Sequence, residues 1–296
     1  MNCGLHPHVE QPTPNRQATS KYHKCPGRAD GEGARATGSA CKGVPVHDEE
    51  RDFLGLINAA TAVQLRGWNF SFLAGRTISQ PLPWDYLQLA QLAVRSARRV
   101  LDVDTGGGEI LAAIGPPAGS IAVEPHPPNL ALAAATLSPH HVEVRACVSA
   151  RLPAADGEVD LVLNRHGALD VREAFRVVQV GGTLLSQQVG RHNDTEFNEA
   201  LRVPPLGGAA IESVDNAITA LVGAGFQVAR CEEARPQTRY LDIGAIVLQL
   251  RAVSWQVPGF DVQQHLDQLR RIHHHIGQHG SFTVTSHRLL LIAQRT

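Results

Sequence analysis

The segment that decides the fold runs from Arg99 to Pro125 and reads Arg-Val-Leu-Asp-Val-Asp-Thr-Gly-Gly-Gly-Glu-Ile-Leu-Ala-Ala-Ile-Gly-Pro-Pro-Ala-Gly-Ser-Ile-Ala-Val-Glu-Pro. It opens with a short apolar run at 100–103, which is long enough for a buried strand. Three glycines follow at 106–108, and apolar residues then recur at helical spacing. A second apolar run ends in Glu124. This order of strand, glycine turn, helix, strand and acid predicts half of a doubly wound nucleotide-binding sheet.

Each part of this segment suits a bound nucleotide. Glycines let the backbone turn sharply and let a ligand approach closely. Backbone N–H groups at the start of the next helix suit a carboxylate or a phosphate. Glu124 follows the first strand by about 20 residues, the spacing at which an acid accepts hydrogen bonds from a ribose. The alternative is a turn that binds nothing, but glycines and acid occurring together favour binding.

The acids around the glycines favour a cationic nucleotide. The glycines are contiguous rather than spaced as Gly-x-Gly-x-x-Gly, and Asp102 and Asp104 directly precede them. A pyrophosphate there would meet two anions. S-adenosylmethionine instead combines a ribose with an ammonium and a sulfonium, which carboxylates attract. The charge pattern therefore favours this methyl donor over a dinucleotide.

Residues 100–108 resemble motif I of class I S-adenosylmethionine-dependent methyltransferases, and Glu124 resembles their ribose-binding acid. The sequence from about Glu50 to Arg295 also resembles a type 11-like, actinobacterial branch of these methyltransferases. The recurring segments of that branch match residues 101–109, 123–130, 164–166, 181–183, 187–190 and 255–260. One departure is Asp104, where most of the family has glycine. The resemblance implies that S-adenosylmethionine is the cofactor and that it is held by Asp102, Asp104, Thr105, Gly106, Gly107, Gly108, Glu124, Pro125, Ser149 and Asn164.

The resemblance also implies the architecture. It is an α/β, Rossmann-like, doubly wound sheet of seven mostly parallel strands, with helices on both faces and the last strand antiparallel. We expect the strands at 100–103, 121–123, 141–145, 161–163, 183–187, 226–232 and 282–293. The predicted domains are a disordered tail at 1–46, a helical cap at 47–98 and the catalytic domain at 99–296, with a helical insertion at about 243–277.

Polar residues follow the predicted fourth and fifth strands, at the edge where open α/β sheets bind their ligands. His166 is placed to accept a proton from an acceptor hydroxyl or amine. The alternative is that it caps a helix or packs beneath the donor. Arg165 binds an acidic acceptor or, as the simpler expectation, pairs with Asp170. Gln187 and Gln188 could orient the acceptor by hydrogen bonds.

Other candidate contacts come from aromatic residues and from the end of the third strand. Trp68, Trp84 and Trp255 are predicted to line the acceptor pocket, with core or lid packing as the alternative for each. Val148 stands where the family often has a polar residue that contacts the adenine. Ser149 or a backbone N–H group is expected to take over this contact.

Composition restricts the partners. A net charge of −1 gives no general attraction to nucleic acid or to an anionic membrane, and no apolar run reaches about 18 residues. The first residues lack the basic and apolar regions of a secretory signal, and the five cysteines form no regular framework. A cytoplasmic protein is therefore predicted. Cysteines and histidines in the tail, and His273, His274 and His275, have metal sites only as alternatives to a solvated tail and a polar helix end.

The sequence thus predicts a metal-independent methyltransferase that acts on O, N or C of a small-molecule acceptor. Two alternatives stay open. One is a catalytically inactive methyltransferase fold that serves as a binding or scaffold protein, which Asp104 and Val148 favour. The other is a nucleotide-dependent oxidoreductase.

Overall fold

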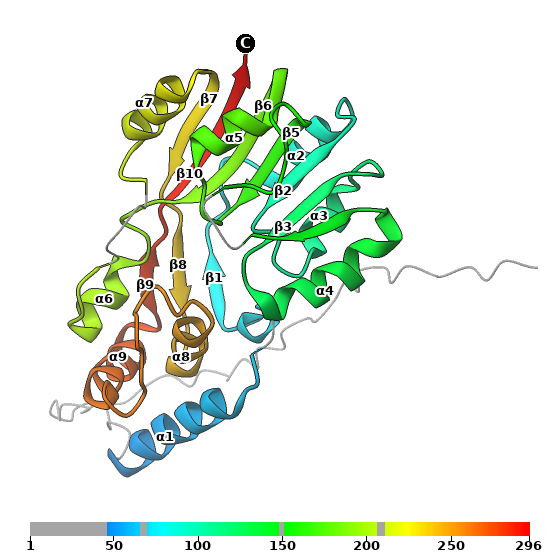
Figure 1. Ribbon diagram of the computed structural model, residues 1–296. Coiled ribbons are helices and arrows are strands. Elements are labelled where there is room, and N and C mark those ends of the chain that lie inside the picture. Colours follow the sequence, from blue (N-terminus) through cyan, green and yellow to red (C-terminus); the bar gives the residue numbers. More distant parts are fainter. Residues whose placement is uncertain (1–45, 66–69, 148–150, 206–210) are drawn as a thin grey trace, which may run out of the picture. The chain divides into compact units, whose positions relative to one another are not determined.

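A seven-stranded sheet carries the candidate site (Figure 1). The computed structural model describes residues 46–65, 70–147, 151–205 and 211–296. The strand order is β4-β3-β2-β5-β6-β10-β7, in which β10 alone runs antiparallel to its neighbours. The strands are β2 (Val100–Val103), β3 (Ile121–Glu124), β4 (Glu143–Ala146), β5 (Val159–Arg165), β6 (Val178–Val189), β7 (Phe226–Ala234) and β10 (Arg288–Arg295). This confirms the predicted doubly wound sheet with an antiparallel last strand.

Helices cover both faces of the sheet because its strands are apolar on both sides, as buried parallel strands are. One face packs against α2 (Tyr86–Val94), α3 (Glu109–Ile114) and α4 (Pro127–Leu137). The other packs against α5 (Val171–Val177) and α7 (Val214–Ala224). Side chains alternate along each strand, so Leu163 belongs to the first core and Val162 to the second.

A second body, which we call the cap, contains a small antiparallel sheet in the order β1-β8-β9. Its elements are α1 (Val46–Ala62), the short η1 turn (Ser71–Leu73), β1 (Thr77–Ser79), α6 (Thr195–Leu201), β8 (Gln237–Tyr240), α8 (Ile243–Ala252), α9 (Leu266–His279) and β9 (Phe282–Thr285). They share a core that includes Phe53, Phe197 and Ile246. The predicted insertion at 243–277 lies within the cap, whereas α2, from the predicted 47–98 segment, packs on the large sheet.

The cap is continuous with the large sheet. Strand β7 leads into β8, and strand β9 leads into β10. These two segments stay paired across the junction, where the Ser286 N–H donates to the Pro236 carbonyl at 2.9 Å. The prediction of one continuous strand over 282–293 is therefore wrong. Its first part pairs with β8 in the cap and its second part pairs with β6 and β7. Strands β1 and β8 were not predicted, because neither has a clear periodicity of its own.

A buried polar cluster fixes this junction. Asp194 accepts hydrogen bonds from Ser286 Oγ at 3.0 Å and from Asn193 Nδ2 at 2.9 Å. Gln256 Nε2 donates to the Asn193 carbonyl and to Asn198 Oδ1, at 3.0 and 2.7 Å. The cluster joins the start of α6, the segment after α8 and the corner between β9 and β10. Because its members satisfy one another's hydrogen-bonding groups, we assign the cluster a structural role.

The tail predicted at 1–46 lies almost wholly outside the described residues, and so do its cysteines and histidines. Among the described residues, no helix is long and apolar enough to cross a membrane. In the same part of the chain, no group of three or more His, Cys, Asp or Glu side chains is arranged to hold a metal ion.

The glycine turn predicts a measurable packing cost. Gly108 has φ +83° at the start of α3, and a Cβ there would lie 2.8 Å from Leu137 Cγ of α4. Gly119 has nearly the same φ, +81°, with nothing within 4 Å of the corresponding position. We expect Gly108→Ala to lower the free energy of unfolding by about 1–3 kcal/mol more than Gly119→Ala, measured by urea denaturation. Equal losses would mean that backbone strain alone decides, since both variants carry it.

Candidate functional site

Five polar side chains from five strands lie on one face at the carboxyl edge of the sheet. They are Glu124 on β3, Asp102 on β2, Arg165 on β5, Gln187 on β6 and Arg288 on β10, and we call them the polar row. The strand register and the alternation of side chains place them together, through the pairs Asp102↔Ala122, Asp102↔Leu163, Arg165↔Gln187 and Val189↔Arg288. This is the face that α2 covers, with Trp84 and Tyr86 in its core.

The polar row is divided by charge. Its acidic half contains Asp102 and Glu124, together with Asp104 from the turn after β2. Its basic half contains Arg165 and Arg288, together with His166 from the end of β5. In the described part of the chain, no basic side chain forms an ion pair with the three acids, and no acid forms one with the three bases. The separation therefore leaves both halves open to charged ligands.

Glu124 holds the glycine turn. Its Oε2 accepts the Gly106 N–H and its Oε1 accepts the His126 N–H, both at 2.7 Å. The side chain is buried, with 3% of the residue exposed. Each carboxylate oxygen has two acceptor sites, so one site on each oxygen is left after these bonds. Glu124 can therefore shape the turn and still accept two hydroxyl groups.

Asp102 is a buried acid with no basic partner. Its pKa is raised to about 7, first by burial and then by the negative charges of Asp104 and Glu124, while the neighbouring Thr105 opposes the shift. A cationic ligand beside this carboxyl would favour its ionised form. The acidic half is therefore matched in charge to an ammonium or a sulfonium.

Asp104 connects two loops at the same edge. It has a left-handed backbone, with φ 58°, and its carboxylate accepts the Ala168 N–H at 2.6 Å. Burial raises its pKa, and the hydrogen bond from Ala168 opposes that shift. A Cβ on Gly167 would collide with the Asp104 side chain. The Asp104 side chain is thus accommodated by a glycine in the loop after β5.

Asn164, Ser186 and Gln188 lie on the opposite face from the polar row. Asn164 Nδ2 donates to the Val103 carbonyl at 3.0 Å, and Asn164 Oδ1 accepts from Ser186 Oγ at 3.1 Å and from Gln188 Nε2. All three residues are buried. Their polar atoms satisfy one another and tie β2, β5 and β6 together, so the predicted donor and acceptor contacts of Asn164 and Gln188 gain no support from this geometry.

A hydrogen-bonded chain leads from Trp84 to His166. Trp84 Nε1 donates to Gln187 Oε1 at 2.8 Å, which turns the amide nitrogen of Gln187 toward His166 Nε2, 2.7 Å away. His166 Nε2 is then the acceptor, and the proton of the neutral ring is on Nδ1. The surrounding protein, and next the charges of Arg288 and Arg165, lower the pKa of His166 to about 3. Its role as general base stays a prediction and requires Gln187 to release Nε2.

Arg165 does not pair with Asp170, which corrects the simpler expectation. The Asp170 side chain instead caps α5, accepting the N–H groups of Arg172 and Glu173 at 2.9 and 3.2 Å. Arg165 is exposed, and its side chain makes no hydrogen bond or ion pair with any residue that the structure describes.

Sequence reasoning missed Tyr86 and Arg288. The Tyr86 hydroxyl is buried and has no hydrogen-bond partner in the described chain, and it lies close enough to Asp102 and Arg165 for both charges to affect its pKa, which burial raises. It therefore lies between the two halves of the polar row. Tyr86 follows Trp84 by two residues, which is a usable signal. No sequence signal pointed to Arg288, because its position depends on an antiparallel register that the sequence does not reveal.

The remaining predicted residues are dispersed. Trp68 and Ser149 lie outside the described residues. Trp255 belongs to the segment after α8 and is 42% exposed. Thr105, Gly107 and Pro125 lie in the turns after β2 and β3, beside the acidic half.

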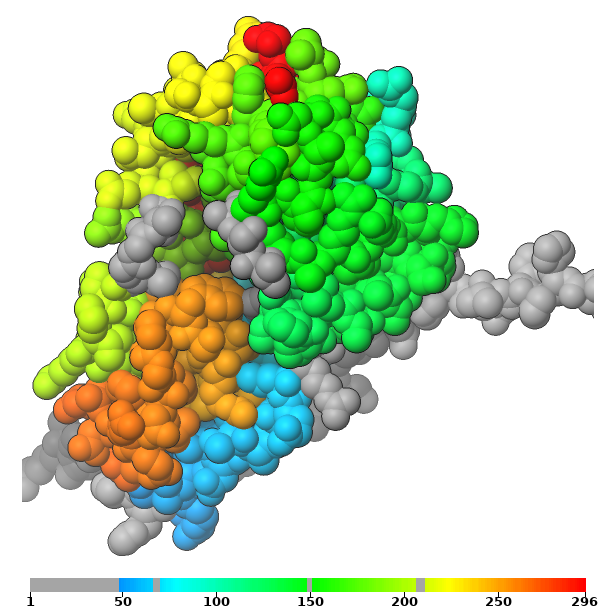
Figure 2. Space-filling model, viewed as in Figure 1, coloured from blue at the N-terminus to red at the C-terminus, as the bar shows by residue number. Residues whose placement is uncertain are grey.

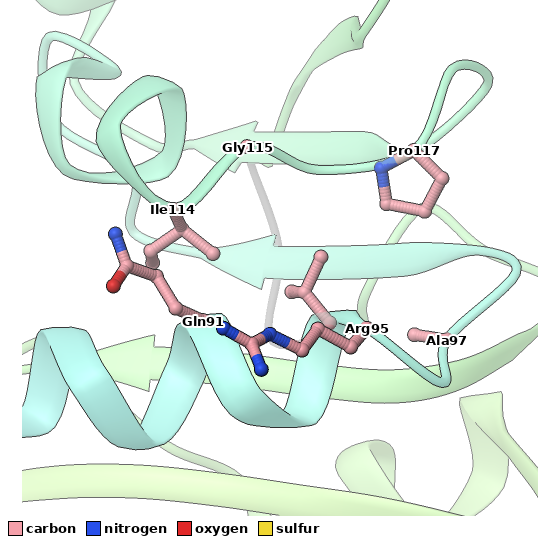
Figure 3. A pocket seen from close by; sticks show the side chains of 7 residues that line it. Gln91, Arg95, Ala97, Ile114, Gly115 and Pro117 are labelled. Carbon is pink, nitrogen blue, oxygen red and sulfur yellow. The ribbon is translucent and has the colours of Figure 1, made fainter.

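A cavity of about 500 Å³ lies away from this edge. It lies between the carboxyl-terminal ends of α2 and α3, where Gln91, Arg95 and Ile114 contribute to its lining (Figure 3). The strands β2 and β3 begin on this side of the sheet, so the cavity is opposite to the edge where the polar row lies. It contains none of the predicted site residues. A second hollow, of about 480 Å³, lies in the cap between α6, α9 and β9, which are coloured yellow-green (α6) and orange to red-orange (α9 and β9) in Figures 1 and 2.

Comparison with solved structures identifies the fold. A Bacillus halodurans C-125 protein named as a putative methyltransferase matches with a TM-score of 0.54 at 19% identity, over 71% of this chain and 98% of that one. YcgJ from Bacillus subtilis matches with 0.52 at 16% identity, over 71% and 97%. A functionally unknown protein from Deinococcus radiodurans R1 matches with 0.50 at 16% identity, over 77% and 97%. No protein-family model and no curated protein matches the sequence. The chain therefore shares the Rossmann-like methyltransferase fold.

The buried Asp102 predicts a pH-dependent stability. Because its pKa is raised to about 7, the folded state binds this proton more tightly than the unfolded chain does. Asp102 therefore costs stability at pH 8, and this cost disappears as the pH falls toward 4. We expect Asp102→Asn to be more stable than the wild type by a few kcal/mol at pH 8, and by much less at pH 5. Urea denaturation at both pH values measures this, with Asp215→Asn on α7 as the control. An advantage that does not change with pH would contradict the prediction.

His166 is expected to stay neutral from pH 8 down to about pH 4, because its pKa is lowered to about 3. NMR titration of its ring Cε1–H resonance measures this directly. Removing one of the charges that disfavour protonation, with Arg165→Gln, is expected to raise the pKa of His166. A midpoint near 6.5 in the wild type would show that the ring is not held in this environment.

Proposed function

We propose that the protein is an S-adenosylmethionine-dependent methyltransferase that acts on O, N or C of a small-molecule acceptor without a metal. One observation carries the proposal. Asp102, Asp104 and Glu124 converge at the glycine turn with no ion pair to a described basic side chain, and burial raises the pKa of Asp102 to about 7. An acidic site with a ribose-binding geometry suits an adenosyl ligand that carries positive charge.

The residues present fit this donor. The two acceptor sites that Glu124 keeps match the two ribose hydroxyls, and the left-handed glycines Gly106 and Gly108 leave the turn without Cβ atoms. Asp102 and Asp104 supply the negative charge that an ammonium and a sulfonium require. The donor, when bound, supplies an electrophilic methyl group, and the chain's part is to hold the acceptor in line with it.

Side chains for this positioning lie in and beside the polar row, on the side of its basic half. Trp84 fixes the amide of Gln187, and Gln187 in turn orients His166. If the acceptor displaces the Gln187 amide, the freed His166 Nε2 can accept the acceptor's proton. The low pKa of His166 makes it a weak base, so orientation rather than proton removal is its main contribution.

Finer assignments belong to the same proposal. We infer that the chain is a cytoplasmic member of the type 11-like, actinobacterial branch that motif I and the segments around 164–166 and 255–260 resemble. Asp104 favours one competing function, a binding protein that holds the donor without turnover, because its side chain occupies the place of a glycine beside the donor.

Calorimetry with S-adenosylhomocysteine tests the donor site. We expect the full chain to bind it, and Glu124→Gln to weaken binding by about tenfold or more, because the amide loses an acceptor for the ribose. Glu109→Gln, an exposed change in the first turn of α3, is the matched control. Asp104→Asn should weaken binding of S-adenosylmethionine, whose sulfonium carries the charge, more than that of the neutral thioether product.

Three outcomes decide between the candidates. Absence of heat and of a thermal shift with either ligand would overturn the proposal. Preferential binding of a nicotinamide dinucleotide would favour an oxidoreductase. Tighter donor binding in Asp104→Asn, with no turnover by the wild type on a broad acceptor panel, would favour the inactive binding protein.

A further inference from the structure

Arg165 and Arg288 form a cationic pair on the side of the polar row away from the glycine turn. They belong to strands separated only by β6, and the register places both on the face that carries Gln187. Neither guanidinium forms an ion pair with a described carboxylate. Each lies near enough to His166 to disfavour its protonation. Two cations that repel each other and share no counter-ion form a site for an anion.

Arg288 is the less exposed of the two and is held in place. Its Nη1 donates to Asn193 Oδ1 and to the His287 carbonyl, the latter at 3.0 Å. The negative charge of Asp194 attracts it, but the two residues form no ion pair and the oxygens of Asp194 already accept from Ser286 and Asn193. Burial, and next the repulsion from Arg165, lower the pKa of Arg288 despite Asp194. The positive charge of Arg288 is therefore only partly compensated by the protein.

Two neutral groups lie among these charges. Gln187 on β6 lies between Arg165 and Arg288 in the strand order. The Tyr86 hydroxyl, buried and without a hydrogen-bond partner in the described chain, is close enough to Asp102 and Arg165 for both charges to affect its pKa. A buried hydroxyl without a partner is uncommon in folded proteins and often marks a ligand contact. Tyr86 is therefore placed to meet the part of a ligand that lies between the anion site and the donor.

We propose that Arg165 and Arg288 bind an oxyanion, a carboxylate or a phosphate, and that the methyl acceptor is a small anionic molecule anchored by this group. Guanidinium groups present paired N–H donors that match both oxyanions. The identification of this anion as the methyl acceptor rests on the proposed function, whereas the oxyanion site itself does not.

The division of charge gives this anchor a second effect. The acids around the glycine turn repel the acceptor's oxyanion, and the arginines repel the cationic donor, so neither ligand can occupy the other's place. The acceptor is therefore oriented with its charged end at β10 and its other end toward β2. This orientation is what an in-line transfer needs, because the reacting atoms must be aligned before reaction.

The experiment uses the full chain with inorganic phosphate and acetate as probes. Binding is measured by calorimetry and by NMR shift of His166, first alone and then with S-adenosylhomocysteine at saturation. We expect wild-type protein to bind at least one probe and Arg165→Gln and Arg288→Gln to weaken that binding about tenfold each. Arg172→Gln, which changes an exposed arginine on α5 that has no ion pair with a described residue, should bind as the wild type does.

The outcomes separate this inference from the proposed function. Probe binding that is absent, or equal in the wild type and in Arg165→Gln, overturns the oxyanion site; Arg165 is exposed, so this variant is expected to fold. Unchanged S-adenosylhomocysteine affinity in Arg165→Gln, with lost probe binding, supports two distinct subsites. Arginine-dependent probe binding without any donor binding would support the anion site and overturn the methyltransferase. Sodium chloride at matched ionic strength controls for general screening.

Discussion

The parallel register of β2, β3, β5 and β6 is the constraint from which the site follows. Parallel strands end at one edge, and side chains that share a face are brought into a line there. Glu124, Asp102, Arg165 and Gln187 come from four separate segments of the chain, yet the pairing leaves them no other arrangement. The antiparallel β10 enters between β6 and β7 and adds Arg288 at its first residue. The sheet therefore sets the charge division of the polar row, and Asp104 and His166 extend it from the turns that follow β2 and β5.

Two sets of polar residues near this edge, the cluster around Asp194 and the polar row, show how structural and functional polar residues differ. Around Asp194 and Gln256, donors and acceptors are matched, and the cluster joins three segments. In and beside the polar row, the buried Asp102 lacks a cation and the buried Tyr86 hydroxyl lacks a partner, while the exposed Arg165 lacks an acid. Unmatched groups cost stability. The retention of several of them within one row indicates that ligands, rather than the protein itself, complete these interactions.

Much of the fold followed from the sequence because the glycine turn and its two apolar runs are local signals. Val100–Val103 was located to the residue, and the strand ending in Glu124 to within one. The acidic half could also be predicted, since its members lie within 25 residues or so of one another. The basic half could not. Arg165 was singled out with the wrong partner, because Asp170 caps α5. Arg288 depends on the split of 282–295 between two sheets, which is a long-range event without a local signature.

The link between the cap and the large sheet has a consequence for how the protein can change. Both covalent connections on this side, β7 to β8 and β9 to β10, pass through one hydrogen-bonded ribbon. The bond between the Ser286 N–H and the Pro236 carbonyl, together with the polar cluster around Asp194, holds the two segments where they pass from one sheet to the other. The segment between Pro236 and Ser286 therefore begins and ends at paired positions of the ribbon. The intervening 50 residues or so share their core with α1 and α6 and their sheet with β1, so they could be exchanged for another segment only together with these contacts.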